Sequence, residues 1–189
     1  MENIELSKIK KEIEKLEKNK THNIHKISNE IDLNKKCLLM RFYMNSQSGG
    51  RIFENIFIKH FNFTSTKSDI GDIIDNHGNI CELKYSGFTK IRNNIIKFNY
   101  VQLRPHQHNI ISYYYLCAYN LYENDFGELY IFKLPSKIIE KLIIKHGTYA
   151  HGKKIDNGII SKKNFKKHEY ALRPSYGNKL WKILTKYKI

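Results

Sequence analysis

Three residues whose types and spacing could support chemistry lie close together in the chain. Glu82 and Lys84 stand two positions apart in an apolar run, and nine residues separate Asp72 from Glu82. Because side chains of a β-strand alternate between its faces, a strand over 80–85 places Glu82 and Lys84 on one face and the apolar side chains on the other. The turn-forming residues 75–79 predict a hairpin that brings Asp72 beside this pair.

Two carboxylates and one lysine that converge on one spot predict metal-dependent chemistry at phosphate. Hard oxygen ligands suit Mg²⁺, which keeps several waters and binds through one or two carboxylates together with substrate phosphate. A lysine beside that metal can orient or deprotonate a water molecule, or neutralise charge that develops on the phosphate. The reaction that fits these groups is hydrolysis of a phosphodiester.

The order of these residues resembles the PD-(D/E)xK nuclease superfamily, and in particular type II restriction endonucleases. The resemblance covers residues 50–135 and rests on Asp72, the nine residues after it, and the triplet Glu-Leu-Lys that begins at Glu82. The family motif often has proline before the first acid, whereas this chain has Gly71. That departure leaves Asp69 as an alternative first acid.

The resemblance implies a role for each residue. Asp72 and Glu82 are expected to hold Mg²⁺, with Asp69 as the alternative first ligand, and Lys84 to position or activate the water. The family also places an acid on the helix before the hairpin, which here is Glu54. Glu54 is expected to assist catalysis through a second metal or a bound water; the alternative is an ordinary solvated carboxylate.

The hydrophobic pattern predicts an α/β fold, a central mixed β-sheet flanked by helices, as in the core of restriction endonucleases, with an N-terminal helical arm. Apolar residues at helical spacing predict helix over 4–33, either a coiled-coil-like dimerisation arm or a helix packed on its own domain. Residues 1–36 are therefore assigned to the arm and 37–189 to an endonuclease domain. The other expected elements are helices over 51–61, 137–145 (capped by Ser136) and 180–184, strands over 113–119, 129–134 and 169–172, a loop at 45–50 and a helix that starts within 101–108.

The charge of the chain favours a polyanionic partner. The sequence has 33 Lys and Arg against 18 Asp and Glu, a formal net charge of +15. A folded domain this basic most often binds nucleic acid, because neutralised phosphates release counterions; the alternative is the lysine-rich composition of a low-GC genome. DNA-recognition segments are expected near 87–109 and 146–168. The candidate DNA-binding residues are Lys90, Arg92, Gln102, Arg104, His151, Lys153, Lys154, Lys162 and Lys163.

The cysteines and the hydropathy pattern predict an intracellular protein. Cys37, Cys81 and Cys117 match no zinc-binding spacing, and their odd number argues against a disulfide framework. Cys81 and Cys117 lie in apolar runs and are expected to be buried thiols in a reducing, cytoplasmic environment. No apolar signal segment opens the chain, and no run approaches transmembrane length.

These observations predict a site-specific, Mg²⁺-dependent double-stranded DNA endonuclease. One alternative is a structure-specific nuclease of DNA repair or recombination with the same catalytic residues. The other is a basic nucleic-acid-binding module without catalysis, which explains the charge but not the acids gathered at 69–82. A palindromic target implies a homodimer, and the resemblance leaves open a cognate DNA methyltransferase that acts on the same site.

Overall fold

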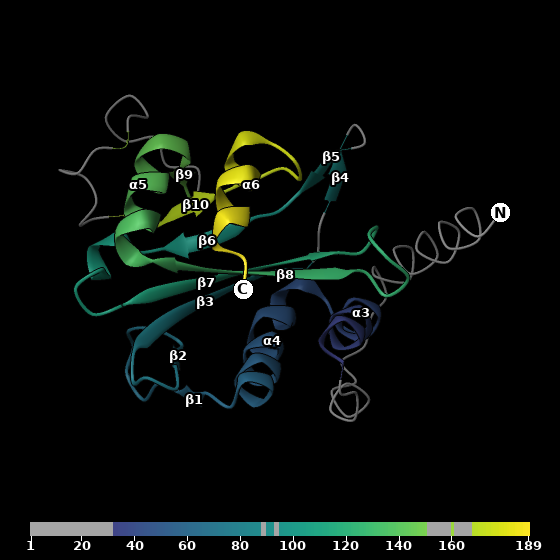
Figure 1. Ribbon diagram of the computed structural model, residues 1–189, viewed down its shortest axis with the longest axis horizontal. Helices are drawn as coiled ribbons and strands as arrows, with labels where there is room; N and C mark the ends of the chain where they lie inside the picture. Colours follow the sequence, from purple (N-terminus) through teal and green to yellow (C-terminus); the bar gives the residue numbers. More distant parts are fainter. Residues whose placement is uncertain (1–31, 88–89, 93–94, 151–159, 161–167) are drawn as a thin grey trace.

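The computed structural model describes residues 32–87, 90–92, 95–150, 160 and 168–189 (Figure 1). Most of the predicted N-terminal arm therefore lies outside the described residues, and the predicted boundary at residue 36 falls within the first described helix. The helices are α3 (Leu33–Tyr43), α4 (Ser46–Phe61), α5 (Ser136–His146) and α6 (Lys179–Leu184), with short 3₁₀ turns η2 (Pro105–Gln107) and η5 (Thr185–Tyr187). The strands are β1 (Thr64–Ser65), β2 (Ile73–Ile74), β3 (Ile80–Ser86), β4 (Lys90–Arg92), β5 (Ile95–Lys97), β6 (Tyr100–Leu103), β7 (Tyr113–Asn120), β8 (Glu128–Pro135), β9 (Thr148–Tyr149) and β10 (Tyr170–Leu172).

A mixed five-stranded sheet forms the centre of the fold. Its strand order is β1-β2-β3-β7-β8, in which β3 and β7 are parallel and the other neighbours are antiparallel. The three strands β6, β10 and β9 form a second, antiparallel sheet, and β4 and β5 form a separate two-stranded ribbon. The α/β fold class with a mixed sheet flanked by helices is thus confirmed.

Helices cover both faces of the central sheet. In Figure 1, α3 and α4 lie on one face of the central sheet. On the other face lie α5, α6 and the three-stranded sheet of β6, β10 and β9, called the small sheet below. Cys81 and Leu83 are buried in the core beneath α4, and Tyr85 packs against the same core, as the strand alternation predicts. The parallel register sets Glu82 beside Tyr114 and Lys84 beside Leu116, which belong to the other core. The acid–lysine pair therefore points toward the small sheet.

The α4 helix begins earlier than predicted. Residues 45–50 were expected to form a loop, but α4 starts at Ser46 and includes Gly49 and Gly50. The Asn45 side chain caps the helix by accepting a hydrogen bond from the Ser48 backbone N–H at 3.1 Å. This cap satisfies a backbone donor that the first turn leaves without an intrahelical partner, which offsets the low helix propensity of the two glycines.

The predicted helix within 101–108 is wrong. Residues 100–103 form β6, and only a 3₁₀ turn follows at Pro105–Gln107. The pairing of β6 with β10 shifts register between Tyr170 and Leu172, and Gln102 adopts a φ of 58°. The irregularity is of the β-bulge kind, which bends a strand and redirects its side chains.

The predicted strands at 113–119, 129–134 and 169–172 and the predicted helices at 137–145 and 180–184 are confirmed within one or two residues of their ends. The predicted cap of α5 is wrong. The N-cap position is Pro135, and the Ser136 hydroxyl instead donates a hydrogen bond to the Ile111 carbonyl.

Candidate active site

The carboxylate of Asp72 is fixed at the point where the central sheet loses a strand. The β2 strand is two residues long and pairs with β3 only as far as Cys81. Beyond that point the Leu83 backbone N–H donates to Asp72 Oδ2 at 2.8 Å, and the Asp72 N–H donates to the Cys81 carbonyl at 2.9 Å. The side chain of Asp72 thus replaces the missing strand as a partner for β3, which holds the carboxylate in one orientation.

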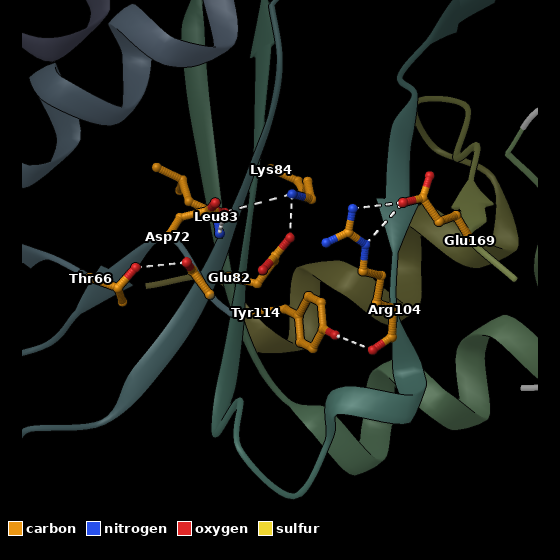
Figure 2. Close-up of polar contacts among 9 residues, drawn as sticks. Thr66, Asp72, Glu82, Leu83, Lys84, Arg104, Tyr114 and Glu169 are labelled. Carbon is orange, nitrogen blue, oxygen red and sulfur yellow. Dashed lines mark hydrogen bonds and ion pairs between the residues drawn. The ribbon is translucent and has the colours of Figure 1, made fainter. Parts of the chain in front are cut away.

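The backbone conformation of residue 71 accounts for glycine, and not proline, directly before Asp72. The φ of Gly71 is 73°, a left-handed conformation that glycine adopts readily and that proline, with φ near −65°, cannot adopt. A Cβ at this position would also lie 2.5 Å from the Ile80 side chain. The Thr66 hydroxyl donates to the Gly71 carbonyl at 2.8 Å and secures the turn before Asp72 (Figure 2).

Glu82 and Lys84 form an ion pair that also includes Asp72. Lys84 Nζ contacts Glu82 Oε1 and lies 3.6 Å from Asp72 Oδ2. Figure 2 shows these three side chains pointing toward one another. Glu82 is only 7% exposed, and this burial, together with the negative charge of Asp72, raises its pKa although Lys84 opposes the rise. A buried carboxylate with a raised pKa beside a second carboxylate is typical of a functional site.

Glu54 lies within electrostatic reach of the same cluster. Burial and the charge of Asp72 raise the pKa of Glu54, and Lys84 and Arg51 act in the opposite direction. The helix that carries Glu54 packs against β3 through Phe53, whose ring stacks on Tyr85 with centroids 4.0 Å apart. The structure therefore brings the helix acid toward the hairpin acids, although Glu54 makes no direct contact with them among the described residues.

The donor set fits Mg²⁺ as a cofactor that completes its shell with water and phosphate. Asp72 and Glu82 offer carboxylate oxygens that already converge on a cation, the Lys84 ammonium. Within the described residues no three Asp, Glu, His or Cys side chains gather as a ready-made metal cage. Mg²⁺ is commonly bound through one or two carboxylates together with substrate oxygens. Asp69, the alternative first acid, is exposed and has no described contact with Glu82 or Lys84.

Arg104 faces the acids from the opposite side of the site. Its Nε and Nη2 both donate to Glu169 Oε1, at 2.9 and 2.7 Å. These hydrogen bonds raise the pKa of Arg104 against the effect of burial, and the charges of Glu82 and Asp72 raise it further. The Tyr114 hydroxyl donates to the Arg104 carbonyl at 3.2 Å. Sequence reasoning missed Glu169 and Tyr114, because each meets Arg104 only through the tertiary fold.

The remaining candidate DNA-binding residues are only partly placed. Gln102 is exposed at the irregularity in β6. Lys90 and Arg92 belong to β4, whose backbone is described but whose side chains are not. The other candidates, His151, Lys153, Lys154, Lys162 and Lys163, lie outside the described residues.

The cysteines are structural. All three are free and buried, as was predicted for Cys81 and Cys117. Burial raises the pKa of both Cys37 and Cys81 to about 12, so that neither thiol is a nucleophile near neutral pH. No helix in the described part of the chain has both the length and the hydrophobicity to cross a membrane.

Comparison of the chain with protein-family models and with curated proteins found no match.

Proposed function

We propose that this protein is a Mg²⁺-dependent DNA endonuclease that hydrolyses phosphodiester bonds, with Asp72, Glu82, Lys84 and Glu54 as its catalytic residues. The observation that carries the proposal is the convergence of Asp72 and Glu82 on Lys84 at the β2–β3 hairpin. The mixed sheet and the helix acid agree with the resemblance to PD-(D/E)xK nucleases.

Each residue has a distinct part in the proposed reaction. Asp72 and Glu82 would hold Mg²⁺, and Glu54 would assist through a second ion or a bound water. The ion would polarise a phosphoryl oxygen and lower the pKa of a bound water. Lys84, which contacts both acids, would orient the attacking water and stabilise negative charge on the phosphate.

The charge balance of the chain supports DNA as the substrate. The net charge of +15 favours a polyanion, yet the site gathers carboxylates. Carboxylates repel phosphate unless a cation lies between them, and a metal-dependent phosphodiesterase supplies that cation. The binding-module alternative explains the net charge of the chain but not the gathered carboxylates.

The first test is incubation of the purified protein with unmethylated plasmid DNA in Mg²⁺ and in EDTA, followed by gel electrophoresis. We expect cleavage only with Mg²⁺. Asp72→Asn is expected to be inactive, and the matched variant Asp69→Asn, three positions earlier, to cut as the wild type does. An inactive Asp69→Asn beside an active Asp72→Asn would reverse the assignment of the first acid. DNA that stays intact but shifts in mobility would favour the binding module.

The pattern of the products separates the two nuclease classes. Discrete fragments would support a site-specific enzyme similar to type II restriction endonucleases and would give its recognition sequence. A smear, or cutting confined to branched or flapped DNA, would support the repair or recombination nuclease. A palindromic recognition sequence predicts a homodimer, which light scattering of the protein in solution would test. Such a recognition sequence would also make a methyltransferase that acts on the same sequence the expected partner.

A further inference from the structure

One guanidinium nitrogen of Arg104, Nη1, is available to bind a ligand. Nε and Nη2 both bind Glu169 Oε1, whereas Nη1 makes no hydrogen bond to any described residue. Figure 2 shows Nη1 on the side of the guanidinium that faces Glu82 and Lys84. The side chain of Arg104 is 38% exposed, so that a ligand in the site could reach it.

Arg104 is held at both ends of the residue. Glu169, just before β10, fixes the guanidinium, and Tyr114 on β7 fixes the backbone carbonyl. Tyr114 is the register partner of Glu82, so this hydrogen bond ties Arg104 to the strand that lies beside the acids. The irregular conformation of Gln102 lies two residues before Arg104 and redirects the end of β6. Together these contacts fix a cation opposite the acids.

An ordinary cross-strand ion pair explains part of this geometry. Glu169 and Arg104 extend the pairing of Tyr170 with Leu103, and such a pair stabilises a sheet by a modest amount. It does not explain why the third guanidinium nitrogen, Nη1, is turned toward Glu82 and Lys84 (Figure 2). A planar guanidinium can bind a carboxylate through one edge and still offer Nη1 to a phosphate oxygen in a fixed direction, which a flexible lysine ammonium does not do.

We propose that Arg104 is a substrate-contacting residue that binds a backbone phosphate of DNA across from Asp72 and Glu82, and that Glu169 is the residue that positions it. This inference rests on the proposed nuclease function, since it names a further contact of the same site. The two acids would approach the phosphate through the metal ion, and Arg104 would approach it directly. Glu169 would hold the guanidinium in place before DNA arrives, so that less side-chain entropy is lost on binding.

The test combines cleavage with the salt dependence of DNA binding. Affinity for a duplex is measured in EDTA over a range of salt concentrations, for the wild type, Arg104→Gln and Lys141→Gln. Lys141 is exposed on α5, so its variant is a control for loss of one positive charge. The slope of log K against log salt is negative, and loss of one phosphate contact decreases its magnitude by about 0.9. We expect this decrease in Arg104→Gln, together with roughly 100-fold slower cleavage in Mg²⁺, and neither change in Lys141→Gln.

Two further variants separate positioning from charge. Arg104→Lys keeps the positive charge but lacks the planar guanidinium and its fixed N–H donors. We expect it to retain the salt dependence of DNA binding and to cut DNA more slowly. Glu169→Gln is expected to slow cleavage by up to about 100-fold, the cost of a misplaced group, while DNA is bound at least as tightly because a negative charge is lost. If the Arg104 and Glu169 variants melt at lower temperatures but keep the wild-type salt slope and the wild-type cleavage rate, the two residues form a structural pair only. That result would overturn the inference.

The outcome also separates this inference from the proposed function. A wild-type protein that cuts DNA, with an Arg104→Gln variant that cuts equally well, would overturn the inference alone. A wild-type protein that binds but does not cut would overturn the nuclease, and the salt slope of Arg104→Gln would still decide the phosphate contact. No binding of duplex by the wild type would overturn both. If Arg104→Gln does not fold, Arg104→Lys and Glu169→Gln still decide, through the split between binding and cleavage.

Discussion

Two lysine–carboxylate pairs on the central sheet place the same chemical groups in different surroundings. Asp75 pairs with Lys133 Nζ at 3.2 Å, and Glu82 pairs with Lys84 two positions along the same strand. Both carboxylates are buried, with residue exposures of 5% for Asp75 and 7% for Glu82. Burial alone therefore does not distinguish Asp75 from Glu82, the proposed catalytic acid.

The difference lies in how many donors each carboxylate receives. Burial opposes the charged form of Asp75, but hydrogen bonds outweigh it and lower the pKa. They come from the side chain and backbone of Asn79, the backbone of His77 and the ammonium of Lys133. Glu82 has Lys84 as its one partner by hydrogen bond or ion pair among the described residues, and its pKa is raised. The oxygens of Asp75 are filled with hydrogen bonds and close a turn, whereas the oxygens of Glu82 keep lone pairs available for a cation.

The largest predicted effect is the loss of cleavage when Glu82 is neutralised. Glu82→Gln is expected to cut DNA at least about 1,000-fold more slowly, because charge stabilisation by a bound metal is worth several kcal/mol. Asp75→Asn should cut within a few-fold of the wild type at a temperature where both are folded. Initial rates on one plasmid substrate in Mg²⁺ measure both variants. Equal losses in the two would mean that the donor count does not separate the acids.

Variants of Lys84 and Lys133 should differ in cleavage in the same way as variants of Glu82 and Asp75. Lys84→Ala is expected to slow cleavage by about 100-fold or more, in the range for a group that positions or activates water, while DNA is still bound in EDTA. Lys133 contacts Asp75 and lies over the rings of Tyr113 and Tyr115, at 4.5 and 5.4 Å from their centroids. Lys133→Ala should therefore lower the melting temperature and spare cleavage. A Lys84→Ala protein that still cuts would refute the assigned role.

The sequence predicts the Glu82–Lys84 pair and its hairpin, because these depend on local rules, but not the pairing of Asp75 with the distant Lys133. Strand alternation alone separates Glu82 and Lys84 from Cys81 and Leu83, and the turn formers between Asp75 and Asn79 fix the hairpin. The apolar patterns of β7, β8 and α5 are long and regular enough to identify those elements. Each of these inferences involves residues close together in the chain.

The parts that sequence did not reveal depend on distant contacts or on competing local preferences. The Arg104–Glu169 pair joins two strands that no nearby pattern connects. A helix was predicted within 101–108, but residues 100–103 form an irregular strand in which Gln102 has a left-handed φ. The first turn of α4 was missed because its glycines resemble a loop, while a single capping side chain, Asn45, offsets their cost.

Stability should respond to the two acids in opposite ways. Asp75→Asn is expected to lower the free energy of unfolding by about 1 to 3 kcal/mol, because buried donors lose a charged acceptor. Glu82→Gln should leave that free energy unchanged or raise it, because the fold disfavours the charged form of Glu82. Urea denaturation near neutral pH without metal measures both. A Glu82→Gln protein less stable than Asp75→Asn would show that the Glu82–Lys84 pair is chiefly structural.

The smallest predicted effect is the pH dependence of the Asp75 contribution. The folded pKa of Asp75 is below its unfolded value, so its stabilisation is complete above the unfolded pKa, about 3.9, and is lost as pH falls through the folded pKa. The difference in unfolding free energy between wild type and Asp75→Asn should thus be constant from about pH 6 down to pH 5 and shrink below about pH 4. Urea denaturation at a series of pH values measures this difference. Lys133→Ala should show a smaller difference with the same trend, because it removes only one of the donors that lower the pKa of Asp75. A difference that grows on acidification would mean that burial, and not hydrogen bonding, governs Asp75, and the contrast with Glu82 would then disappear.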